Sequence, residues 1–166
     1  MSHPVTTITP GQQQDLAVKL DALSDAVTAA RETFRRQIDA EFDLVGTPTV
    51  PNCDEITHGA TVSLTGKTAN FTYAVTCDHD TAAWLARRFF DLAPEDDTAL
   101  ADLADALNEI PTVAAGMWKA RRGEHGEQYQ LGLPMFMRGS GWLRFFSKGV
   151  NAISQRLGGP EGTGLQ

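Results

Sequence analysis

Four residues with acidic, hydroxyl or small side chains follow one another at spacings of four, three and four: Asp105, Glu109, Thr112 and Gly116. An α-helix makes one turn every 3.6 residues, so these spacings place all four on one helix face. Two carboxylates, and a hydroxyl that both donates and accepts hydrogen bonds, suit contact with water or with the polar surface of a partner. The spacing therefore predicts a polar helix face turned toward solvent or a partner.

The same segment also carries an apolar stripe at helical spacing, formed by Leu100, Leu103, Leu107, Ile110, Ala114 and Met117. Each polar residue lies two positions from a stripe residue, or about 200° around the axis, so the two faces point in opposite directions. The turn-forming and acidic residues 94–98 favour a helix start. We expect a helix over about 98–119 with its apolar stripe in the core.

The stretch from Asp105 to Gly116, with Leu133-Pro134 and Gly139 downstream, resembles the signature of the CheC/CheX/FliY group of chemotaxis phosphatases. The order of predicted elements from about 15 to 157 also resembles CheX, and the single motif is more similar to CheX than to the double-motif CheC. The resemblance implies an α+β fold, with a mostly antiparallel sheet packed against long helices, and a homodimer. The apparently unclosed sheet, whose edge needs cover, agrees with a dimer.

In that group the helix inserts two side chains into the acyl-phosphate site of a phosphorylated, CheY-like receiver domain. The resemblance implies that Glu109 pairs with the receiver's lysine and that Asp105 supports it one turn earlier. Gly116 and Pro134 complete the matching positions, and we expect all four to contact the partner. The Mg²⁺ belongs to the receiver, so the resemblance implies no cofactor and no metal for this chain.

The position that orients the attacking water is Asn in the group and Thr112 here. The hydroxyl is one heavy atom closer to the backbone than an amide, and a β-branched side chain has a stiff rotamer. Pro111 removes a helical hydrogen bond and disfavours α geometry at Ile110, which predicts a kink between Glu109 and Thr112. Such a kink moves Thr112 outward or brings Asn108 round as the amide, so Glu109, Thr112 and Asn108 are the candidate catalytic residues.

Other interpretations of these residues stay open. An acidic stripe is also what an ordinary solvated helix face looks like. Gly116 could serve close helix packing, and Pro134 could simply begin a strand. If the surface is functional, the chain is either a CheX-like phosphatase or a non-catalytic binding or scaffold module that uses the same helix.

Length and charge narrow the class of protein. The 166 residues suit one domain, with 1–14 a flexible segment and 15–166 the CheX-like domain. A net charge of −7 without a basic run argues against nucleic acid and anionic membranes as partners. No leader-like N-terminus or long apolar stretch occurs, so we expect a cytoplasmic location.

Cys53, Cys77, His58 and His79 raise the alternative of a zinc site at one end of a hairpin. Their spacing matches no recognised zinc motif, so ordinary packing of Cys77 and a strand-end His58 is favoured.

The remaining elements come from periodicity and turn residues. We expect a long amphipathic helix from Asp15 to about Phe42, an edge or bulged strand over 42–50, a hairpin of 56–64 with 71–77, a short helix over 81–92, and a strand over 128–133. Residues 142–153 suggest further strands or a short helix. The stretch 158–166 is interpreted as a Gly-rich stop, where CheX-like proteins would have another strand, so that the chain would end early or be shortened.

Overall fold

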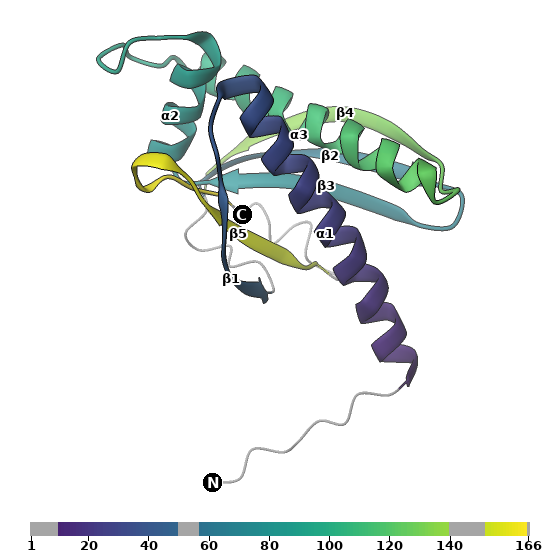
Figure 1. Ribbon diagram of the computed structural model, residues 1–166. Helices are drawn as coiled ribbons and strands as arrows, with labels where there is room; N and C mark the ends of the chain where they lie inside the picture. Colours follow the sequence, from purple (N-terminus) through teal and green to yellow (C-terminus); the bar gives the residue numbers. More distant parts are fainter. Residues whose placement is uncertain (1–9, 50–56, 140–151, 166) are drawn as a thin grey trace, which may run out of the picture.

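The computed structural model describes residues 10–49, 57–139 and 152–165 (Figure 1). The elements, in chain order, are α1 (Pro10–Ile38), β1 (Asp43–Thr49), β2 (His58–Gly66), β3 (Asn70–Cys77), α2 (His79–Phe90), α3 (Leu100–Glu124), β4 (Tyr129–Arg138), β5 (Ser154–Gly158), the 3₁₀ turn η1 (Pro160–Gly162) and β6 (Gly164–Leu165). The strands form two antiparallel sheets, in the orders β3-β2-β4 and β1-β5-β6. The predicted α+β class, with antiparallel sheets against long helices, is confirmed.

The β2–β3 hairpin is the predicted one, extended by two residues beyond Leu64. Leu64 lies opposite Phe71 and His58 opposite Cys77, so alternate residues of both strands point to the same face. On β2 that face includes Ala60, Val62 and Leu64, which are buried. The alternation thus predicted the hairpin correctly, and the other face of β2 is also buried at Gly59 and Thr61.

We expected the strand over 128–133 to end before Pro134, but it does not. β4 continues to Arg138, and Pro134 lies opposite Val62 in the pairing with β2. Proline is tolerated because β4 is at the edge of its sheet within the described part of the chain, and a strand edge without a neighbour needs no N–H donor. The same strand exposes Leu133 and Met135. The expected homodimer stays a prediction.

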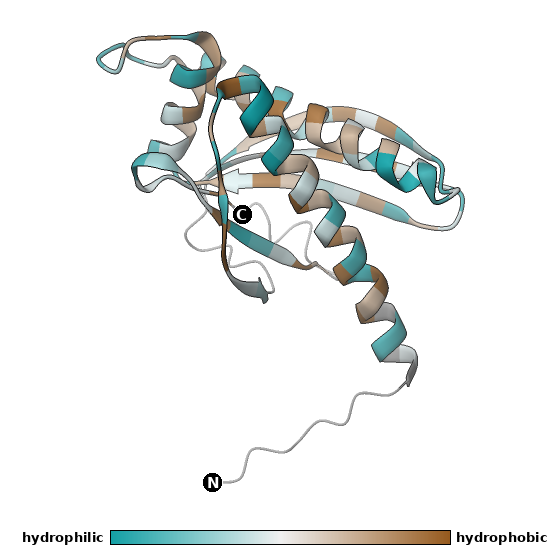
Figure 2. Cartoon of the chain, in the orientation of Figure 1, coloured by the Kyte–Doolittle hydropathy of each residue, from teal (hydrophilic) through white to brown (hydrophobic). Residues whose placement is uncertain are grey.

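The first helix begins earlier and ends earlier than predicted. α1 starts at Pro10, so residues 10–14, expected to be flexible, are helical, and it stops at Ile38 rather than near Phe42. Asp39 has a φ of 49°, the left-handed conformation that commonly terminates helices. Hydrophilic and hydrophobic residues alternate along α1, which agrees with an amphipathic helix (Figure 2).

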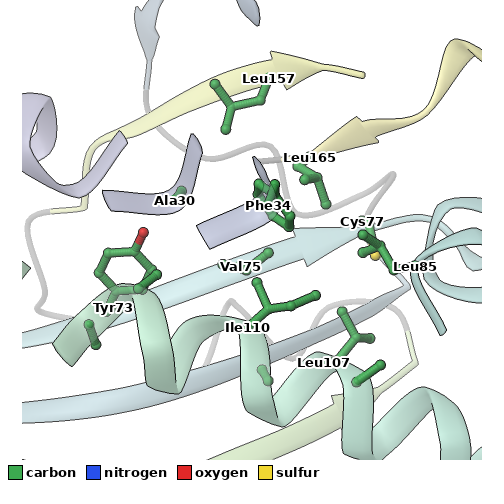
Figure 3. Close-up of a cluster of buried hydrophobic side chains, with 14 of the residues drawn as sticks. Ala30, Phe34, Tyr73, Val75, Cys77, Leu85, Leu107, Ile110, Leu157 and Leu165 are labelled. Atoms are coloured by element: carbon green, nitrogen blue, oxygen red, sulfur yellow. The ribbon is translucent and has the colours of Figure 1, made fainter. Parts of the chain in front are cut away.

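α3 lies along the sheet and is crossed by α1 (Figure 1). Its Leu107 and Ile110 are fully buried and point toward Val75, with Phe34 of α1 beyond them (Figure 3). Fully burying a side chain of this size contributes about 1.5–3 kcal/mol. Of the predicted stripe, Leu103, Leu107, Ile110 and Ala114 are buried and fix how α3 is rotated on the sheet. The prediction was wrong for Leu100, which is exposed at the first residue of the helix, and Met117 is half-buried.

α3 passes the predicted limit of 119 and ends at Glu124, and Arg122 ties this end to the neighbouring segments. The Arg122 guanidinium is buried and donates to Asp21 at 2.6 Å, to Asp25 at 3.2 Å and to Glu127 at 2.5 Å. Burial disfavours its charge, but these hydrogen bonds outweigh burial and raise its pKa. One cation thus joins α1, α3 and the segment that leads into β4.

The second sheet corrects the expectation for the C-terminal stretch. Residues 158–166 do not simply stop the chain: Leu165 pairs with Leu157 of β5, and both side chains are buried. The sequence did not predict this strand, because the stretch is rich in glycine and β6 has only two residues. β1 is the predicted edge strand, with an irregularity between Val45 and Thr49. The prediction for residues 142–153 lies almost wholly outside the described residues.

Candidate functional site

Asp105, Glu109, Thr112 and Gly116 form an accessible ridge along α3, here called the α3 ridge. Asp105 and Glu109 are exposed, and Thr112 and Gly116 are half-buried. The opposite face of the helix is held in the core by Leu107 and Ile110. The prediction that these four residues share a face away from the core is confirmed, while their roles stay predictions.

The two carboxylates of the ridge are not engaged by neighbours. Among the described residues, neither Asp105 nor Glu109 forms a salt bridge or a side-chain hydrogen bond, whereas Asp21, Asp25 and Glu127 are all bound to Arg122. An exposed, unpaired carboxylate keeps its charge available for a cation on another molecule. The ridge can therefore dock a positively charged group.

Thr112 is partly committed to its own helix. Its Oγ1 donates to the backbone carbonyl of Asn108 at 2.6 Å. A hydroxyl has one hydrogen to donate and two lone pairs that accept, so Thr112 retains acceptor capacity while this bond lasts. The hydroxyl can accept a hydrogen bond from a water above the ridge, but it cannot donate one to that water at the same time.

Asn108 lies beside the ridge, where its side-chain carbonyl is hidden. Its Oδ1 is inaccessible to solvent and has no hydrogen-bond partner within the described residues. A buried carbonyl oxygen without a partner is costly, so this side chain would gain from a rotation that hydrates it. In the present conformation Oδ1 does not reach the surface from which Glu109 projects.

Pro111 does not break the helix. α3 runs without interruption from Leu100 to Glu124, and the Pro111 ring is fully buried. Burial of the ring offsets part of the cost of a proline inside a helix. The expected outward turn of Asn108 is not seen, because its Oδ1 is hidden from solvent.

The structure separates the remaining two candidates. Among the described residues, a Cβ built on Gly116 meets nothing within 4 Å, so Gly116 does not serve close packing against that part of the chain. Pro134 belongs to β4, where it is half-buried, and is therefore not part of the helical ridge.

Beyond Gly116 the same helix face continues through Lys119, Ala120 and Gly123, which the sequence analysis did not select. They line a hollow together with the β2–β3 turn and the start of β4. The sequence could have predicted that these residues share the face of Gly116, because they follow it by three, four and seven residues, which is helical spacing.

At the opposite end of the sheet, His58 and His79 lie side by side with ring centroids 5.1 Å apart. His58 is buried, its Nδ1 is 2.9 Å from the Thr57 hydroxyl, and its Nε2 has no partner among the described residues. Burial lowers the pKa of His58, helped by His79 and Arg138 and opposed by Asp78. In the part of the chain that the structure describes, which omits Cys53, no three His, Cys, Asp or Glu residues are grouped to hold a metal.

Comparison with solved structures places this architecture. CheX of Desulfovibrio desulfuricans matches 87% of this chain and 95% of its own, with a TM-score of 0.68 and 17% identity. The CheX–CheY–BeF3–Mg²⁺ complex of Borrelia burgdorferi matches 87% of this chain and 94% of its own, with a TM-score of 0.73 and 20% identity. FliY of Thermotoga maritima matches 96% of this chain and 90% of its own, with a TM-score of 0.61 and 13% identity.

The chain has the CheC/CheX/FliY fold. The resemblance predicted from the α3 residues is thus confirmed in three dimensions. No protein-family model matches the sequence, and no curated protein matches it. Within the CheX-like fold, none of the helices among the described residues is long and apolar enough to cross a membrane.

Proposed function

We propose that this chain docks a phosphorylated CheY-like receiver domain on the α3 ridge and hydrolyses its acyl phosphate. The observation that carries the proposal is the pair of exposed carboxylates, Asp105 and Glu109, which have no ion-pair partner among the described residues. They lie one turn apart on a helix whose other face is buried in the core. The CheX-like fold supports it, because the Borrelia burgdorferi CheX is seen in complex with CheY, BeF3 and Mg²⁺.

Glu109 would dock the receiver by pairing with a lysine of its phosphorylation site. Thr112 would orient the attacking water, since its hydroxyl can still accept a hydrogen bond while donating to Asn108. Orienting a water for in-line attack is a positioning task, so the rate depends closely on the reach of this side chain. Thr112 is better placed than Asn108, whose Oδ1 is hidden.

The same observations support a second candidate, a binding module without catalysis. The hydroxyl of Thr112 is held toward its own helix, and the amide oxygen of the nearby Asn108 is hidden from solvent. A chain with this ridge would recognise the receiver through Glu109 and leave the phosphate intact.

Phosphate release from an acyl-phosphorylated receiver separates the two. We expect the chain to accelerate release, Glu109→Lys to abolish the acceleration by reversing the docking charge, and Thr112→Asn to increase it because the amide reaches further and adds a donor. Binding without acceleration would favour the binding module for that receiver. Equal rates for the parent chain and both variants would contradict the roles given to Glu109 and Thr112.

A further inference from the structure

The C-terminal half of α3 borders a groove, here called the α3–β4 groove. It encloses about 810 Å³ between α3, the turn after β2 and the first residues of β4. Gly116, Ala120 and Gly123 supply the helix side, and Cβ atoms built on Gly116 and Gly123 meet no described residue within 4 Å. The helix side of the groove is therefore open, and another chain can approach the α3 backbone closely.

Two lysines give the groove its charge. Lys67 on the turn and Lys119 on α3 both line it and are exposed, and neither forms a salt bridge among the described residues. Glu127, the acidic residue of the lining, is held by Arg122 at 2.5 Å and by the Tyr129 hydroxyl at 2.7 Å. The groove thus presents two uncompensated cations on a chain whose net charge is −7.

The groove adjoins the α3 ridge, because Gly116 belongs to both. One helix face therefore changes sign along its length, from Asp105 and Glu109 to Lys119. A face with two signs binds a partner best in a single orientation, since turning the partner around opposes like charges.

We propose that the α3–β4 groove receives an acidic segment of the same receiver domain that docks on the α3 ridge. The inference rests on the proposed function and adds to it a second contact, which sets the orientation of the receiver. Lys67 and Lys119 attract the segment, and the open helix side admits its backbone.

The test measures how tightly this chain binds a CheY-type receiver domain from the same organism. The receiver is activated with BeF3 and Mg²⁺. We expect Lys67→Glu and Lys119→Glu each to weaken binding about fivefold or more at about 50 mM salt, mainly through slower association. The loss should shrink at about 500 mM salt. Arg156→Glu is the matched control, because it makes the same charge change at an exposed position on β5, away from α3.

Each outcome decides the matter. The inference is supported if Lys67→Glu and Lys119→Glu weaken receiver binding more than Arg156→Glu does. It is also supported if binding of a lysine variant recovers when an acidic residue of the receiver is changed to Lys. Lysine variants that bind like Arg156→Glu, while Glu109→Lys still abolishes binding, overturn the groove and leave the proposed function standing. No binding of the unaltered chain to any such receiver overturns both.

Discussion

The two ends of α3 use carboxylates in opposite ways. At the C-terminal end Asp21, Asp25 and Glu127 surround the buried Arg122, and every one of them is bound to it. At the ridge, Asp105 and Glu109 are exposed and make no ion pair among the described residues. The first group holds three segments of the chain together, and the second leaves its charge to solvent or a partner.

The difference shows that acidity alone does not identify a function in this chain. A carboxylate next to a desolvated guanidinium is part of the packing, because removing either leaves a charge without compensation. An exposed, unpaired carboxylate contributes little to stability and can form an ion pair with another molecule. Substitutions at the two ends of α3 should therefore separate stability from binding.

The largest effect is expected at Arg122. Arg122→Ala should lower the free energy of unfolding by about 2–3 kcal/mol, since the ion pairs and the packing of the guanidinium on Trp118 are lost while the partly exposed carboxylates regain some water. Urea unfolding followed by circular dichroism measures this change.

Glu109→Gln is the control at the other end, with an expected change within about 0.5 kcal/mol. Equal stability losses at Arg122 and Glu109 would contradict the division between the two ends.

The next effect concerns His58, which is buried and whose Nε2 has no hydrogen-bond partner among the described residues. Its pKa lies below 6.5 in the folded state, so below pH 6.5 the unfolded chain binds more protons and stability falls as pH decreases through the folded pKa. We expect the free energy of unfolding to decline by at most about 1.4 kcal/mol per pH unit from this group. Urea unfolding between pH 7.5 and 5.5 measures the slope.

His58→Gln should flatten this part of the pH profile. His79→Gln should keep most of it, because burial is the main cause of the shift and the charge of His79 comes second. Parallel profiles for the parent chain and His58→Gln would show that another group is responsible.

The smallest effect is expected at Gly116, where the ridge meets the groove. Gly116→Ala should raise the free energy of unfolding by about 0.5–1 kcal/mol, because alanine is the better helix former and its methyl group enters open space. A loss of stability would mean that Gly116 is packed after all. Thermal unfolding of the parent chain and of Gly116→Ala under the same conditions measures this difference in stability.

Local patterns allowed much of the fold to be predicted. The β2–β3 hairpin, the buried stripe of α3 and the edge position of β1 follow from alternation, helical spacing and turn residues, all of which act over a few residues. The passage of β4 through Pro134 and the pairing of Leu165 with Leu157 were missed, because both depend on which strand lies alongside. Local propensity carries no information on which strands become neighbours in a sheet.

The site was predictable to a similar degree. The common face of Asp105, Glu109, Thr112 and Gly116 followed from spacing alone. The buried Oδ1 of Asn108 and the continuous helix through Pro111 did not, since both depend on how α3 packs against its neighbours. The sequence did not indicate the groove, because Lys67 and Lys119 are 52 residues apart in the chain and come together only in the fold.

Residue order by itself determined which side of α3 is apolar and which is acidic, because helical geometry converts spacing directly into direction. The tertiary structure alone decided which carboxylates are bound to Arg122 and which stay free. Pairing between charges depends on distances across segments far apart in the chain, and these are set only when the helices pack on the sheet.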